Sequence, residues 1–243
     1  MLDTEVLDDP HADPTLVQRT LRDIVVLNRL FGGTGAVLSG LRSVFEKHGM
    51  GDGGWGMRWT LLDIGTGSGD IPIAARRLAG QFGIDLEILG VERIRTAARA
   101  AQQAGLVGVL ADGGALPFGP RSVDIVTVSQ VLHHLPRATA VAWIAALERI
   151  ARRAVILADL RRSRLAMAGL WLAAYPLGFH AVTRHDAILS LRRGYTKREF
   201  QGMLEEAGVG ARAYYRPLAR IVAAWEPRRR TSDVRHQHLT SDV

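Results

Sequence analysis

The apolar positions of the chain follow two spacings, which predict a regular succession of strands and helices. Short apolar runs typical of buried strands cover residues 60–64, 86–91, 107–111, 123–128 and 154–159. Segments in which apolar residues recur at helical spacing lie between them, at residues 70–82, 94–104 and 137–150. Strands that alternate with helices favour a parallel sheet with right-handed crossovers, so the pattern predicts an α/β fold with ligands at the carboxyl ends of the strands.

The remaining parts of the chain add elements at both ends. Helical spacing from Leu16 to Phe31 and from Val37 to His48 predicts an N-terminal helical cap, followed by a glycine-rich linker. Thr196 and Glu199 have capping-box spacing, which predicts a further helix, and residues 209–224 would supply two more strands. We therefore expect a cap and linker over 1–56, a main domain over 57–225 and a disordered basic tail over 226–243.

The first predicted strand runs directly into a glycine-rich turn. Asp63 ends the strand, and Gly65, Gly67 and Gly69 follow at alternating positions. Because glycine has no Cβ, backbone N–H groups in such a turn can approach a ligand closely, and the next helix directs its positive dipole end toward that ligand. The turn suits a ligand carboxylate, and Asp63 supplies a negative charge suited to an ammonium or sulfonium group.

Residues 61–70 resemble the first motif of the class I S-adenosylmethionine (SAM)-dependent methyltransferases. Two later segments resemble this family in the same order: the strand that ends at Glu92, and residues 110–135, where the family holds adenine and runs its fourth strand. The resemblance covers about residues 55–160 and is closest to the small-molecule branch that includes ubiquinone and menaquinone methyltransferases. It implies SAM as cofactor and a Rossmann-like, doubly wound, mostly parallel seven-stranded sheet whose last two strands are antiparallel.

The motifs also imply roles for single residues. Glu92, at the carboxyl end of a strand, is placed to accept both ribose hydroxyls. By resemblance, Asp112 binds the adenine amino group, while Ser129 and Gln130 close over the methionine end of the cofactor. The expected cofactor-binding residues are Asp63, Gly65, Thr66, Gly67, Glu92, Arg93, Asp112, Gly113, Ser129 and Gln130.

Other ligand classes fit the sequence less well. A dinucleotide fold needs a small residue where this chain has Asp70, whose carboxylate would repel a pyrophosphate. The net charge of +7 invites a nucleic-acid interpretation. Base-amino methyltransferases, however, place an Asn/Asp-Pro-Pro-aromatic tetrapeptide after the fourth strand, and this chain has none there. An NAD(P)-dependent oxidoreductase, an RNA methyltransferase and a non-catalytic partner subunit stay open as alternatives, although we expect no nucleic-acid partner.

An uncharged apolar stretch at residues 165–183 follows the fifth predicted strand, within an insertion at about residues 160–195. Methyltransferases hold a lid over the acceptor pocket at this position, and a lid rich in Leu, Trp and Met suits a hydrophobic acceptor. Pro176 and Gly178 interrupt the run, and a span needs about 20 apolar residues, so we expect no stable membrane insertion. The expected pocket residues are Arg161, Trp171, Tyr175, Phe179, His180 and Tyr195.

Methyl transfer from a sulfonium is an in-line displacement, so much of the acceleration can come from holding the reactants in position. A base helps when the acceptor is a hydroxyl. His133 and His134, at the end of the fourth strand, are the expected catalytic residues, with a pocket-shaping role as the alternative. We expect methylation of a small hydrophobic or aromatic acceptor from secondary metabolism, on oxygen, with carbon as the alternative and without a metal.

Composition narrows the picture further. With 47% apolar residues the chain can bury a sizeable core. The absence of cysteine excludes disulfides, thiolate catalysis and cysteine-ligated metal sites. The N-terminus is acidic, at Asp3, Glu5, Asp8 and Asp9, and lacks the apolar core of a signal peptide, so a cytoplasmic location is the default expectation.

Overall fold

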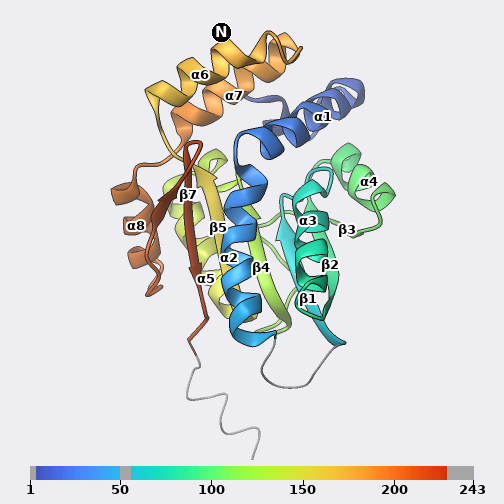
Figure 1. The fold of residues 1–243 in the computed structure, drawn as a ribbon, viewed down its shortest axis with the longest axis vertical. Coiled ribbons are helices and arrows are strands. Elements are labelled where there is room, and N and C mark those ends of the chain that lie inside the picture. The colour runs from blue at the N-terminus through green and yellow to red at the C-terminus, as the bar shows by residue number, and fades with distance from the viewer. Residues whose placement is uncertain (1–3, 50–55, 229–243) are drawn as a thin grey trace, which may run out of the picture.

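The computed structural model describes residues 4–49 and 56–228. Most of the predicted glycine-rich linker and most of the predicted disordered tail lie outside these residues. Within them, the chain forms one seven-stranded sheet with helices on both faces (Figure 1). The predicted α/β architecture is therefore confirmed.

The sheet has the strand order β3-β2-β1-β4-β5-β7-β6. The first five strands in the chain are parallel to one another, and β7 is antiparallel to both β5 and β6, as the resemblance implied. The strands are β1 (Met57–Ile64), β2 (Ile84–Glu92), β3 (Val107–Leu110), β4 (Val123–Ser129), β5 (Ala151–Leu160), β6 (Tyr214–Arg216) and β7 (Arg220–Trp225).

The helices fall into three groups. Helices α2 (Gly33–His48), α3 (Asp70–Gly80) and α4 (Arg95–Gln103) cover one face of the sheet. Helices α5 (Arg137–Ile150) and α8 (Lys197–Glu206) cover the other face. Three more helices gather near the carboxyl ends of the parallel strands (Figure 1): α1 (Pro14–Leu30), α6 (Arg164–Ala174) and α7 (Ala181–Arg193).

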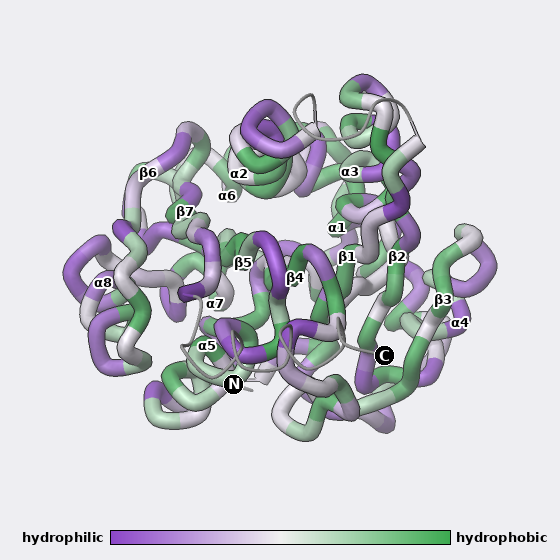
Figure 2. The backbone as a smooth tube through the Cα atoms, turned by 90° about the horizontal axis from the view of Figure 1, so that it is seen from below, coloured by the Kyte–Doolittle hydropathy of each residue, from purple (hydrophilic) through white to green (hydrophobic). Residues whose placement is uncertain are grey.

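The central strands are buried on both faces, which is why they read as continuous apolar runs rather than as alternating ones. In β4, six of the seven residues are buried, and Figure 2 shows hydrophobic positions following the central strands. On the α2 face, Phe45 packs against Trp59 with ring centroids 5.9 Å apart. Two hydrophobic layers therefore fix the sheet between its helices.

Local sequence signals explain most helix ends. The Asp13 side chain accepts a hydrogen bond from the Leu16 N–H, and Pro14 occupies the first turn of α1. The predicted capping box of Thr196 and Glu199 is present at the start of α8. Our prediction for α2 was wrong by four residues, because this helix already begins at Gly33, directly after Gly32 turns the chain with a φ of 78°.

The strand order creates a topological switch point at the carboxyl ends of β1 and β4. Strand β1 pairs with β2 on one side and with β4 on the other, so the chain connections leave the sheet in opposite directions between β1 and β4. Ligands of open α/β sheets bind at such a switch point. No single helix of the described chain is long and apolar enough to cross a membrane. Helices α1 and α2 reach that length and apolar composition only when taken together, and they are bent by 59° relative to each other.

Candidate functional site

A cavity of about 640 Å³ lies at the carboxyl ends of the central strands, beneath α1, α6 and α7. One end is lined by the glycine-rich turn after β1 and by the ends of β2 and β4. The other end is lined by apolar side chains on these helices or directly after α1, among them Leu27, Phe31, Leu170 and Leu191. The cavity therefore joins a polar compartment to an apolar one.

The turn after β1 has the backbone that its glycines predict. Gly65 and Gly67 have φ angles of 71° and 55°, in the left-handed region that favours glycine. A Cβ on Gly65 would lie 2.4 Å from the Val131 side chain, whereas one on Gly67 would meet only Leu21, at 3.5 Å. The space beside Gly67 is therefore open for a ligand to approach the backbone.

The Glu92 carboxylate links the ends of β1 and β2. It accepts hydrogen bonds from the backbone N–H groups of Gly67, at 3.1 Å, Arg93, at 2.9 Å, and Ile94, at 3.2 Å. These donors hold the carboxylate at the cavity wall, in the position that the sequence predicted for a ribose-binding acid. Arg93 also lines the cavity, and its guanidinium donates to the carbonyl oxygens of Leu7 and Asp8.

Asp63 lies at the base of the cavity and is 3% exposed. Burial, with the nearby charges of Asp70 and Glu92, raises the pKa of Asp63 to about 7, although the Thr127 hydroxyl donates a hydrogen bond to it at 2.6 Å. A carboxylate that is costly to ionise by itself becomes favourable to ionise beside a cation. The position of Asp63 therefore suits a positively charged ligand group.

Unsatisfied polar atoms concentrate in this cavity. Among the described residues, five buried side-chain N or O atoms have no hydrogen-bond partner. Four of these atoms belong to cavity-lining residues: Thr20, Thr66, Ser129 and His133. Because buried polar atoms are normally paired, this set is suited to a polar ligand in the cavity. The residues present therefore fit a cofactor with hydroxyl, amino and carboxylate groups.

The loop after β3 supplies another wall. Asp112 and Gly113 both line the cavity, and the Asp112 carboxylate accepts the Gly114 N–H at 2.7 Å. Trp143 of α5 also lines the cavity, and a Cβ on Gly113 would lie 2.2 Å from its ring. Sequence reasoning missed Trp143, because helical spacing alone does not separate a core residue from a cavity wall.

A chain of buried polar contacts connects the loop after β4 to the N-terminal cap. Gln130, whose φ is 57°, donates to the Asn28 Oδ1 at 2.7 Å and accepts from the Arg220 guanidinium at 2.7 Å. Asn28 in turn donates to Asp70 at 3.0 Å, and Arg220 donates to the Phe31 carbonyl oxygen at 2.8 Å. Asn28 and Arg220 were not predicted, because no local pattern marks partners so distant in the sequence.

The two predicted catalytic histidines have different environments. Nδ1 of His133 lies 2.7 Å from Oδ1 of Asp159, with both side chains 1% exposed. An ionised carboxylate can only accept, so Nδ1 carries a hydrogen, and in the neutral ring the lone pair is then on Nε2. This Nε2 is buried without a partner. His133 therefore has the arrangement of a base held in one tautomer, and Asp159 is a site residue that the sequence did not reveal.

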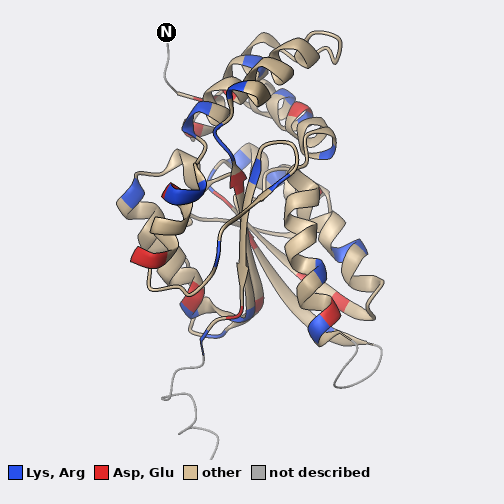
Figure 3. Ribbon diagram, turned by 60° about the vertical axis from the view of Figure 1, so that its left-hand side comes forward, with Lys and Arg blue, Asp and Glu red and all other residues tan. Residues whose placement is uncertain are grey.

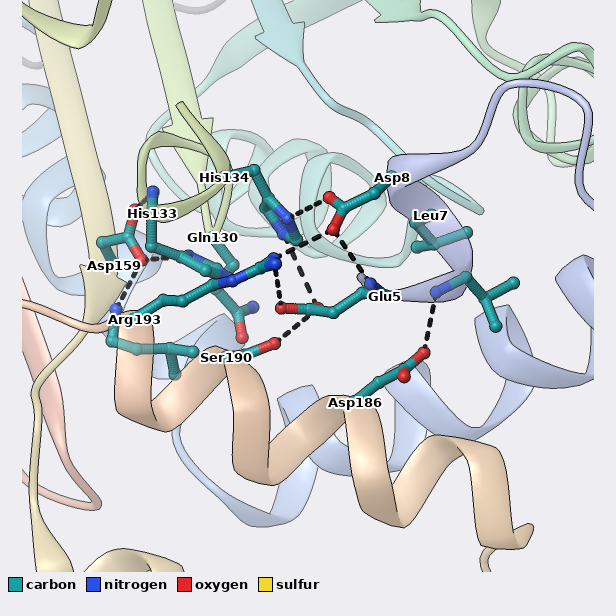
Figure 4. Close-up of polar contacts among 12 residues, drawn as sticks. Glu5, Leu7, Asp8, Gln130, His133, His134, Asp159, Asp186, Ser190 and Arg193 are labelled. Carbon is teal, nitrogen blue, oxygen red and sulfur yellow. Dashed lines mark hydrogen bonds and ion pairs between the residues drawn. The ribbon is translucent and has the colours of Figure 1, made fainter. Parts of the chain in front are cut away.

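His134 belongs to an ionic cluster with the N-terminal segment (Figure 4). Its Nδ1 lies 2.7 Å from Oδ1 of Asp8, and the Arg193 guanidinium contacts Glu5 at 3.1 Å and Asp8 at 2.9 Å. Burial alone would lower the pKa of His134, but the hydrogen bond to Asp8 and the charges of Glu5 and Asp8 raise it. His134 is therefore suited to a positive charge rather than to a lone pair.

Residues 5–8, which we call the N-terminal strap, thus lie between the histidine pair and α7. Ser190 donates to the Glu5 carboxylate at 2.6 Å, and the Val6 N–H donates to Asp186 at 3.0 Å. Glu5, His133 and His134 offer ligand atoms within 4.8 Å of one another. The centroids of the two histidine rings lie 4.1 Å apart with a tilt of 35°, and Arg193 already pairs with Glu5. This cluster is better described as an ion-pair network than as a metal centre.

Only one of the six residues predicted for the acceptor pocket lines the cavity. Arg161 lines the cavity, but the other five residues do not. Trp171 and Tyr175 are exposed on the outer side of α6, and Tyr195 packs on Phe200 below the site. Phe179 is buried away from the cavity, and His180 directly precedes α7, where its N–H donates to Asp23. The inner side of α6, at Ala166, Gly169 and Leu170, lines the cavity instead.

Comparison with known families agrees with this geometry. A family model described as a methyltransferase domain matches residues 61–154, the segment from β1 into β5. This segment of the chain matches the methyltransferase domain family. The predicted family resemblance is confirmed, while the ubiquinone-like branch is not specifically shown. No curated protein matches the chain.

Solved structures support the methyltransferase fold. A SAM-dependent methyltransferase from Aquifex aeolicus has 15% identity and a TM-score of 0.58, with 89% of this chain and 99% of that one covered. Magnesium protoporphyrin IX methyltransferase from Synechocystis, with bound SAM, has 14% identity and a TM-score of 0.59, with 92% and 95% covered. An O-methyltransferase of neocarzinostatin biosynthesis has 19% identity and a TM-score of 0.58; 91% of this chain aligns with 61% of that longer enzyme.

Proposed function

We propose that this methyltransferase transfers a methyl group from SAM to a hydroxyl group of a small, apolar, aromatic acceptor. The observation that carries the proposal is the His133–Asp159 pair, buried beside a cavity with one polar and one apolar end. The pair supplies a base for a hydroxyl acceptor, and the apolar end supplies a surface for an acceptor ring or chain.

The polar compartment would hold the cofactor. Glu92 would accept the ribose hydroxyls, Asp112 the adenine amino group, and the turn at Gly65 and Gly67 would receive the carboxylate, with Asp63 near a cationic group. When bound there, SAM supplies an electrophilic methyl group on a positively charged sulfur. The buried hydroxyls of Thr66 and Ser129, which lack partners, would then find polar atoms to contact.

The chain's own contribution to the reaction is proton removal and positioning. Nε2 of His133 would accept the proton of the acceptor hydroxyl, and Asp159 would stabilise the imidazolium that forms. His133 lines the cavity, but its Nε2 is covered, so an acceptor reaches it only after a local movement of the site. The N-terminal strap and Gln130, which contact or neighbour the histidine pair, are the elements whose shift would uncover it.

The apolar compartment supports an apolar acceptor. Leu160, Leu170 and Leu191 form one buried cluster that reaches the cavity wall, with Leu27 and Phe31 of the cap against it. Two structural neighbours are O-methyltransferases in complex with 1,4-dihydroxy-2-naphthoic acid and with apigenin. Both of these molecules are aromatic and carry hydroxyl groups, which agrees with the shape of this site. C-methylation of a similar ring is the alternative.

Calorimetric titration of the purified chain with SAM, S-adenosylhomocysteine, NADH and NADPH tests the cofactor part of this proposal. We expect binding of the first two compounds only. A preference for a nicotinamide nucleotide would overturn the proposal. No heat from any of the four would indicate a non-catalytic fold and would overturn it equally.

A further inference from the structure

The outer side of α6 exposes large apolar side chains. Leu165 is 87% exposed, Leu172 67% and Trp171 57%. Of the eleven exposed large apolar residues of the described chain, five fall within residues 165–177. Folded chains seldom leave such a cluster in water without a partner, so this side of α6 has the composition of a contact surface.

The same helix forms the wall of the cavity. Ala166 and Leu170 face the cavity on the inner side of α6, and Ala174 is buried. A single helix therefore separates the apolar compartment of the site from the exposed patch. A medium in contact with the patch would lie about one helix diameter, roughly 10 Å, from the acceptor compartment.

The charged residues of the segment that carries the patch are basic. Residues 160–185 contain four arginines and no acidic residue. Arg161 stacks over Tyr215 and Arg162 pairs with Glu199, which leaves Arg164 and Arg184 beside the patch. Arg164 begins α6, and the Arg184 guanidinium stacks 4.2 Å above the Tyr175 ring. Of the nearby acids, Asp23 binds the start of α7 and Asp186 binds the N-terminal strap. Figure 3 shows the helices of this end mostly tan, with several blue segments and a few red ones.

We propose that the outer side of α6 docks on an anionic lipid surface, so that an acceptor dissolved in the bilayer can reach the cavity. The acceptor part rests on the proposed function. Apolar and aromatic side chains flanked by arginines are typical of interfacial helices. With 11 residues, α6 is about 16 Å long, too short to span a hydrocarbon core of about 30 Å, so it would lie in the interface plane.

A second copy of the chain is the less suitable occupant. In a twofold contact each patch faces itself, so the arginines around one α6 would lie close to those around the other. Like charges in such a contact oppose association. An anionic surface uses the same arginines favourably, and the charge complementarity therefore selects the lipid.

Sedimentation with vesicles tests the proposal on the full chain. We expect the wild type to pellet with phosphatidylcholine vesicles containing phosphatidylglycerol and to stay in the supernatant with phosphatidylcholine alone. Leu172→Glu and Leu177→Glu should each weaken binding by about 10-fold or more, because each removes an apolar contact with the lipid. Val107→Glu, on the edge strand β3, is the matched control, with an exposed fraction of 52%, and should bind as the wild type does.

Two activity measurements separate this proposal from the proposed function. The Leu172→Glu variant should methylate a short, water-soluble phenol at the wild-type rate and a long-chain phenol in anionic vesicles at least about 10-fold more slowly. Failure of both methylation assays would count against the proposed function and leave the vesicle result standing. A wild type that does not pellet, a variant that pellets equally, or a dimer that Leu172→Glu dissociates would overturn the lipid proposal.

Discussion

Nδ1 of His133 lies 2.7 Å from Oδ1 of Asp159, and both side chains are almost completely buried. The neighbouring histidine makes an equally short contact with Asp8, but within a cluster that also contains Glu5 and Arg193. Two adjacent histidines of the same sequence motif are therefore prepared for different tasks. In its neutral tautomer His133 has a lone pair on Nε2, whereas the raised pKa of His134 favours the charged form that pairs with the N-terminal strap.

The first prediction concerns the base. His133→Gln should lower kcat toward a phenol by about 100-fold or more and leave SAM affinity unchanged, because only proton removal is lost. The loss should shrink at high pH, where the phenol ionises without help. Kinetics over a pH series with calorimetry of SAM binding measure both effects.

The matched control is the adjacent residue. His134→Gln should lower kcat much less than His133→Gln does, while Asp159→Asn should reproduce most of the His133→Gln loss because the tautomer is no longer fixed. If kcat falls only slightly and equally in the two histidine variants, His133 is not a base, and the enzyme acts by positioning the reactants alone.

The second prediction concerns the strap and its dependence on pH. The pKa of His134 is raised above its ordinary value of 6.5. The contacts of the charged ring with Asp8 and Glu5 therefore stabilise the folded protein fully below pH 6.5, and this contribution is lost as the pH rises through the raised pKa. We expect the free energy of unfolding to fall over that range by on the order of 1 kcal/mol. His134→Gln should lack this part of the decline and keep only the part that Asp63 contributes as the pH rises through about 7. Denaturant unfolding at a series of pH values measures this. If the free energy of unfolding of the variant depends on pH as that of the wild type does, the role of His134 is refuted.

Asp63 gives the third prediction. Burial raises its pKa from 3.8 to about 7, so the neutral form favours folding and this contribution is lost as the pH rises from 3.8 through 7. At pH 8, Asp63→Asn should therefore raise the free energy of unfolding of the ligand-free protein by on the order of 1 kcal/mol. The same variant should bind SAM about 10-fold or more weakly. Thermal unfolding and calorimetry measure the two opposite effects, and a variant that loses both stability and affinity would contradict this account.

The fourth prediction concerns the ribose site. Glu92→Ala removes charge-assisted hydrogen bonds worth roughly 1.5–3 kcal/mol, and SAM affinity should fall by about 10- to 150-fold. Because Glu92 also holds the Gly67, Arg93 and Ile94 N–H groups, Glu92→Gln is the control that keeps one acceptor oxygen. Unchanged affinity in Glu92→Ala would refute the assignment.

The parts of the fold that repeat a strong local pattern could be predicted from the sequence. The central strands are apolar runs bounded by glycine or acidic residues, and the Thr196–Glu199 capping box marks its helix by itself. The positions of Gly65, Gly67 and Glu92 follow in the same way, because a turn and a strand end fix them.

The remaining site depends on contacts between distant segments. Asp8 and His134 are 126 residues apart, and nothing local in the acidic N-terminus marks it as a partner of the histidine pair. The side of α6 that faces the cavity could not be predicted from the sequence either. Apolar residues occur on both its inner and outer sides, at Leu170 and Leu172, so periodicity could not show that Trp171 points away from the acceptor.

The most direct test of the central claim is mass spectrometry of the products formed from methyl-labelled SAM and a set of apolar phenols. Our account predicts one labelled methyl group on the hydroxyl oxygen, absent when that hydroxyl is blocked and strongly reduced with His133→Gln. Labelled product on ring carbon, or label that accumulates only on added RNA, would contradict it.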